Sequence, residues 1–128
     1  MNFVDYLTIP FANLENTPQT ILSATSNVLV VNNIIICNRT GQSIRFNLKK
    51  LRSQDTPVEI FHLNEVEIKP YKTIDAIKEL GLNIFLTFQQ TPAISDSLIC
   101  FSNGSTQKFD CEVNYTALKE LPSQYSML

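Results

Sequence analysis

The most apolar stretch of the chain is Val28–Cys37, VLVVNNIIIC, in which two asparagines interrupt eight apolar residues. At strand spacing both faces are apolar and β-branched residues dominate, which predicts a strand from about 28 to 38 that is covered on both sides. An unpaired buried amide costs ~1–3 kcal/mol. We therefore expect a β-bulge or a sheet rim at Asn32 and Asn33, with both amides bonded to backbone or water. The alternative is a tight Asn-Asn turn between two shorter strands.

Later segments alternate polar and apolar residues as half-buried strands do. Ser43–Arg52 alternates in this way, and the turn residues 38–42 before it include Gly41. This pattern predicts an antiparallel hairpin with the preceding strand. Residues 102–105 (SNGS) predict a second hairpin, between strands at 98–101 and 108–115. Further short strands are expected at 20–24, 58–63, 66–70 and 83–88.

One short helix is expected near residues 73–80. Ile74, Ile77 and Leu80 have helical spacing, Thr73 is a candidate N-cap, and Gly81 is a candidate C′ residue. With about seven to nine short strands and at most this one helix, the pattern indicates an all-β fold, an antiparallel β-sandwich or barrel, of which we favour the sandwich. We assign the sandwich to residues 18–118. Residues 1–17 form an N-terminal arm or a first strand, and residues 119–128 form a C-terminal tail.

Composition limits the partners of this domain. The chain has 128 residues, 44% of them hydrophobic, which is enough for one core. The net charge is −2, and the only basic cluster is Lys49, Lys50 and Arg52. Three charges predict a solvated face and not a nucleic-acid groove. No apolar run is long enough to cross a bilayer, and the N-terminus lacks the pattern of a secretory signal. We expect no direct contact with nucleic acid or membrane.

Residues that carry chemistry are sparse. The histidine, His62, has no acid or thiol nearby that suggests catalysis, and the acidic residues Glu65 and Glu67 are expected on a solvated strand face. The three cysteines lack zinc-site spacing and are expected to be reduced core residues. A hairpin near Ser105 would make Cys100 and Cys111 cross-strand neighbours without disulfide geometry. The sequence predicts no enzyme activity, no metal and no cofactor.

The order of these features resembles small virion proteins of tailed bacteriophages and prophages, of the kind found at the neck or tail. The resemblance covers roughly residues 18–118. The segments that carry it are Thr20–Ala24, the long strand that ends at Asn38, Ile68–Lys72, Asp96–Leu98 and Phe109–Tyr115. Ser95 and Tyr71 depart from the pattern, which usually has a glycine and a small residue at these positions.

The resemblance implies a non-enzymatic structural protein of a phage or prophage particle, assembled in the bacterial host cytoplasm. Its expected partners are copies of itself, arranged as a ring, and other virion proteins. The apolar residues near the two ends are too many to leave in water, so we expect assembly contacts there. The expected contacts are Phe3, Tyr6, Leu7, Ile9, Phe11, Tyr125 and Leu128. A β-sandwich module that binds a sugar or a peptide is the alternative function.

Overall fold

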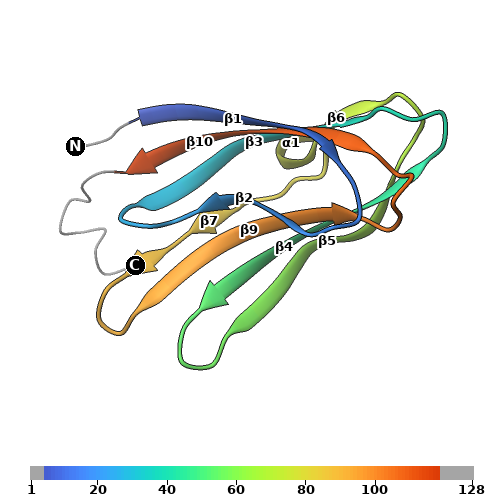
Figure 1. The fold of residues 1–128 in the computed structure, drawn as a ribbon. Helices are drawn as coiled ribbons and strands as arrows, with labels where there is room; N and C mark the ends of the chain where they lie inside the picture. Colours follow the sequence, from blue (N-terminus) through green and yellow to red (C-terminus); the bar gives the residue numbers. More distant parts are fainter. Residues whose placement is uncertain (1–4, 119–128) are drawn as a thin grey trace.

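The computed structural model describes residues 5–118, with side chains from residue 7 onward. Two antiparallel sheets form the upper and lower layers of a sandwich (Figure 1). The predicted all-β sandwich is confirmed. Sheet A contains β1 (Asp5–Leu14), β3 (Val28–Asn38), β6 (Thr73–Asp75), β7 (Phe85–Leu86) and β10 (Phe109–Leu118). Sheet B contains β2 (Gln19–Ser23), β4 (Ile44–Ser53), β5 (Val58–Ile68), β8 (Phe88–Gln89) and β9 (Ile94–Ser102).

Strands that are adjacent in sequence mostly belong to different sheets. Sheet A has the order β1-β10-β3-β6, with β7 also beside β3, and sheet B has the order β2-β9-β4-β5, with β8 beside β9. The chain therefore crosses between the layers at most connections, and β4–β5 is a hairpin within one sheet. The described part of the chain has no helix that is long and apolar enough to cross a membrane.

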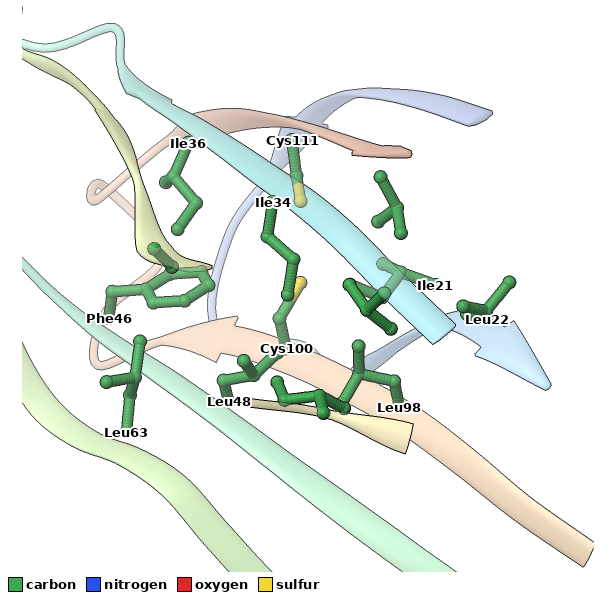
Figure 2. Close-up of a cluster of buried hydrophobic side chains, with 14 of the residues drawn as sticks. Ile21, Leu22, Ile34, Ile36, Phe46, Leu48, Leu63, Leu98, Cys100 and Cys111 are labelled. Carbon is green, nitrogen blue, oxygen red and sulfur yellow. The ribbon is translucent and has the colours of Figure 1, made fainter. Parts of the chain in front are cut away.

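The core lies between the two layers, where the inward side chains of both sheets meet (Figure 2). Phe46 of β4 and Phe109 of β10 are fully buried and pack edge to face, with ring centroids 5.3 Å apart. Edge-to-face contact is the favoured geometry for aromatic pairs, because the positive ring edge meets the negative ring face. This pair joins β4 of sheet B to β10 of sheet A near one end of both strands.

The strand 28–38 and its bulge are confirmed. The register of β3 against β10 shifts between Asn33, opposite Asn114, and Val31, opposite Tyr115, so Asn32 is the extra residue. The prediction that both amides bond to backbone or water is wrong. Asn32 donates to Thr116 Oγ1 at 2.8 Å, and Asn33 donates to a carboxylate oxygen of Asp75. Side chains of neighbouring strands, and not backbone or water, satisfy these amides.

The two hairpins predicted around the turn residues 38–42 and 102–105 are both wrong. β3 lies in sheet A and β4 in sheet B, and the same is true of β10 and β9, so both connections cross between layers. Turn residues allow a sharp reversal whether the two strands pair or pack face to face. The buried side chain of Asn38 fixes the connection between β3 and β4. Its amide donates to the carbonyl of Gln42 within this connection and to the carbonyls of Ile68 and Lys69 at the end of β5, at 2.8–3.1 Å.

The region 58–89 also differs in detail from the prediction. β5 is one continuous bulged strand, where two strands were expected, and the 83–88 segment divides into β7 and β8 in different sheets. The helix is α1, Ala76–Glu79, shorter than expected, because Asp75 and not Thr73 is its N-cap. Asp75 accepts hydrogen bonds from Ile77 N and Lys78 N. Gly81 has φ +67°, as the predicted C′ position requires.

Candidate assembly surfaces

Ionisable and metal-binding side chains are dispersed in the described residues. No group of three or more His, Cys, Asp or Glu side chains among them could hold a metal ion. The buried Nε2 of His62 has no hydrogen-bond partner there. Burial, together with the nearby charge of Lys50, lowers the pKa of His62 below 6.5. The imidazole is therefore neutral at pH 7 and packs as a half-buried side chain.

A buried ion pair joins β9 to β4. Asp96 is fully buried and accepts two hydrogen bonds from Arg52, from Nε at 2.8 Å and from a terminal guanidinium nitrogen at 3.0 Å. Thr87 N donates to the same carboxylate at 2.8 Å. Burial opposes ionisation of Asp96, but the hydrogen bonds from Arg52 and Thr87 outweigh it, so the pKa lies below 3.8. This carboxylate links β4, β9 and the β7–β8 connection, which is a structural role.

Cys100 and Cys111 meet across the core and not across a hairpin. Their sulfur atoms point toward one another from β9 and β10, in opposite layers (Figure 2). All three cysteines are free thiols. The contact with Cys111, together with burial, raises the pKa of the Cys100 thiol well above 9.0. A protonated, buried thiol is a poor nucleophile.

We expect a maleimide reagent at pH 7.5 to modify Cys37, which is half-buried, much faster than Cys100 or Cys111. Mass spectrometry of the folded chain, labelled at a concentration too low for association, should show one adduct per chain, and three adducts after denaturation. Denatured chains alkylated with or without prior reductant should have the same mass. Two alkyl groups fewer in the unreduced sample would contradict the free-thiol state of the three cysteines.

The predicted contact residues near the N-terminus divide between exposed and packed positions. Leu7 is 42% exposed, whereas Ile9 and Phe11 are half-buried and pack against the core. Tyr6 lies in β1, but its side chain is outside the described part of the structure. The remaining contact residues, Phe3, Tyr125 and Leu128, also lie outside it. The structure therefore brings together Leu7, Ile9 and Phe11, on the inward side of β1.

β1 is the outer strand of sheet A, and one of its long sides has no partner strand within residues 5–118. It pairs with β10 from Asp5, opposite Ala117, to Leu14, opposite Phe109. Pro10 lies in the middle of this strand and has no backbone N–H to donate. Proline on an edge strand limits pairing with another chain. The segment that keeps a regular unpaired edge is 5–9.

β5 is the outer strand of sheet B and carries a patch of exposed apolar side chains that were not among the predicted contact residues. Val58, Ile60 and Phe61 are 40%, 50% and 46% exposed. Lys49 Nζ lies 5.9 Å from the ring centroid of Phe61 and 3.1 Å from a carboxylate oxygen of Glu59. The signal was present in the sequence, because residues 58–61 (VEIF) place apolar side chains on both faces of one strand.

Bulges interrupt the rest of the β5 edge. The register against β4 shifts on either side of Leu63, between Phe61 and Leu63 and between Leu63 and Val66. Asn47 bridges the second bulge, because its Oδ1 accepts a hydrogen bond from Glu65 N at 2.9 Å. Bulges twist an edge away from regular pairing. The regular part of this edge is therefore 58–61, where the apolar patch lies.

Comparison with known proteins found no matching family model, no matching curated protein and no matching solved structure.

Proposed function

We propose that this chain is a non-enzymatic structural protein of a phage or prophage particle, a neck or tail component that assembles with copies of itself into a ring. The observation that carries the proposal is the pair of unpaired strand edges, 5–9 of β1 and 58–61 of β5. Edge strands recruit further strands through backbone hydrogen bonds. The resemblance to phage virion proteins supplies the biological setting, in the virion and, during assembly, in the bacterial cytoplasm.

The two edges belong to different sheets and to different sides of the sandwich (Figure 1). A contact between two different surfaces is heterologous, and it repeats head to tail and forms a ring when the rotation between successive copies closes. Pro10 and the bulges of β5 keep both regular segments short. Short edges favour a defined contact over open-ended sheet growth. The exposed side chains of Val58, Ile60 and Phe61 would add apolar burial to such a contact.

Introducing a lysine into the β5 edge tests this proposal. We expect the full wild-type chain to give one discrete oligomer in native mass spectrometry, and Ile60→Lys to shift it to monomer, because the contact would then bury an unpaired charge. Leu80→Lys is the matched control, since Leu80 is 41% exposed and lies outside both edges. Circular dichroism should show both variants folded.

A wild-type chain that stays monomeric at tens of micromolar, alone and with other virion proteins, would overturn the assembly role. The phage setting is tested separately by the neighbouring genes: portal, terminase or tail genes beside this one support it, and their absence from complete genomes contradicts it.

One observation favours the alternative function, a module that binds a sugar or a peptide. A groove of about 430 Å³ opens beside the β4–β5 and β8–β9 connections. Its lining combines the apolar Ala93 and Ile94 with the aromatic ring of Phe88 and several polar side chains, among them Gln54, Asp55, Gln89 and Gln90. Planar amides beside an aromatic ring suit a sugar. Specific binding on a glycan array that Phe88→Ala abolishes, in a monomeric chain, would favour this function over assembly.

A further inference from the structure

The outer face of sheet A is the side of the sheet that points away from the core. Along β3 the inward positions are buried, whereas Val28, Val30, Ile35 and Cys37 alternate with them and are half-buried. No described element lies over this face (Figure 1). The expectation that β3 is covered on both sides is therefore wrong for residues 5–118. Its second apolar face has no cover within the described part of the chain.

This face carries three carboxylates and has a polar centre between two apolar ends. At the centre Asn32 donates to Thr116, and Thr8 donates to Asn114 at 2.6 Å. These hydrogen bonds are made within the sheet, so covering the face leaves them in place. The described strand positions on this face include no lysine or arginine. The outward positions, assigned from strand register, are Thr8, Pro10, Val28, Val30, Asn33, Ile35, Cys37, Thr73, Asp75, Phe85, Asp110, Glu112, Asn114, Thr116 and Leu118.

A projecting aromatic ring stands at one end of the face. Phe85 of β7 is opposite Val30, whereas its neighbour Leu86 is fully buried opposite Leu29. Because directly opposed residues point to the same side of a sheet, Phe85 shares the outer face with Val30. Phe85 is 46% exposed.

A groove lies at the other end of the same face. It has a volume of about 340 Å³, and its lining includes Pro10, Ala12, Ile35 and Cys37. Asp110 and Glu112 form its polar wall. Its apolar lining suits an aromatic side chain, and no described side chain fills it.

We propose that a second copy of this chain docks on the outer face of sheet A, with Phe85 of each copy in the groove of the other. A two-fold axis that lies between the two faces, midway between Phe85 and the groove, forms both contacts at once, which is the self-complementarity of an isologous interface. The area of the face matches that of a small specific interface. The three long strands β1, β10 and β3, together with the short β6 and β7, give a flat area of roughly 550 Å² at about 4.8 Å between strands and about 3.3 Å per residue. A specific interface buries at least about 500 Å² of accessible surface per partner, so this face lies at the small end of that range.

This inference deepens the proposed function, because it names the partner and the face of one self-contact. It is separate from the strand edges, since Phe85 and Ile35 lie outside 5–9 and 58–61. A ring that uses both kinds of contact would stack face to face with a second ring.

Charge complementation tests the contact in the full chain. We expect Phe85→Glu and Ile35→Lys each to weaken the two-fold contact at least about tenfold in analytical ultracentrifugation. The double variant should regain it, because each glutamate then faces a lysine of the partner. Leu80→Glu is the control, and thermal melting should show every variant folded. Single variants that keep wild-type association would overturn the inference.

A cross-link provides a second test that does not depend on tolerance of a charge. Under mild copper-phenanthroline oxidation, Phe85→Cys should form a disulfide with Cys37 of the second copy, and the covalent dimer should run at twice the chain mass without reductant. Leu80→Cys, and Phe85→Cys combined with Cys37→Ser, should give no such dimer. If Ile60→Lys abolishes assembly but the Phe85→Cys variant forms no cross-link, this inference fails and the proposed function stands. A wild-type chain that is monomeric contradicts both the inference and the proposed function.

Discussion

Asn38→Ala is expected to lower the free energy of unfolding by about 3–5 kcal/mol, since each buried polar group left unpaired costs about 1–3 kcal/mol. The Asn38 amide donates to three carbonyl oxygens, and its Oδ1 accepts from both the backbone N and the hydroxyl of Thr40 at 2.8 Å. Alanine cannot replace any of these bonds. Urea unfolding at pH 7 measures the loss.

Two further variants separate this explanation from loss of side-chain volume. Asn38→Asp keeps the shape but turns a carboxylate oxygen toward carbonyl oxygens, so it should destabilise at least as much at pH 7. That penalty should shrink at acidic pH, because the protonated acid can donate one hydrogen bond. Asn83→Ala, at an exposed position, should change stability by less than about 0.5 kcal/mol. An Asn38→Ala cost below about 1 kcal/mol would contradict the role of this side chain.

Asp96→Asn is expected to cost about 2–3 kcal/mol at pH 7, because hydrogen bonds to a charged group contribute about 1.5–3 kcal/mol and the Arg52 side chain left behind is 34% exposed to water. The pKa of Asp96 is lower in the folded chain than its ordinary value of 3.8. The ionised carboxylate therefore stabilises the fold fully above the unfolded-state pKa, and this contribution is lost as pH falls through the folded-state pKa. Urea unfolding between pH 7 and pH 2.5 should show the difference between wild type and variant narrow as pH falls.

The surface pair of Lys49 and Glu59 provides the control. The Glu59 side chain is 49% exposed, so Glu59→Gln should cost less than about 1 kcal/mol. A difference between wild type and Asp96→Asn that stays constant down to pH 2.5 would show that the ionised carboxylate is not the source of the stability.

The amino-acid pattern predicted the position of individual strands well, but it did not predict which strands pair. β-branched residues that are apolar on both strand faces located β3, and two adjacent amides located its bulge at Asn32. The partner of β3 could not be predicted in the same way, because Asn38–Gln42 is turn chemistry that suits a hairpin and a crossing between layers equally. The distinguishing contact is the Asn38 amide with Ile68 and Lys69, thirty residues away in sequence.

The exposure of apolar side chains was predicted least well, for a related reason. Apolar residues near the termini pointed to β1, but Ile9 and Phe11 pack against the core. The exposed patch at Val58, Ile60 and Phe61 escaped notice, because exposure depends on where the opposite layer ends. A sequence pattern gives the face of a strand on which a side chain lies, but not what covers that face.

The position of β10 has a consequence for protein synthesis. It is the last strand to be made in residues 5–118, yet it lies between β1 and β3, which are among the first. At about 5–20 residues per second, a ribosome adds the hundred or so residues between β1 and the end of β10 in roughly 5–20 s. Throughout that interval β1 and β3 have no partner in their own sheet other than the short segments β6 and β7. Sheet A therefore closes only after β10 has left the ribosome, and until then the apolar strand VLVVNNIIIC lacks its long partner strand.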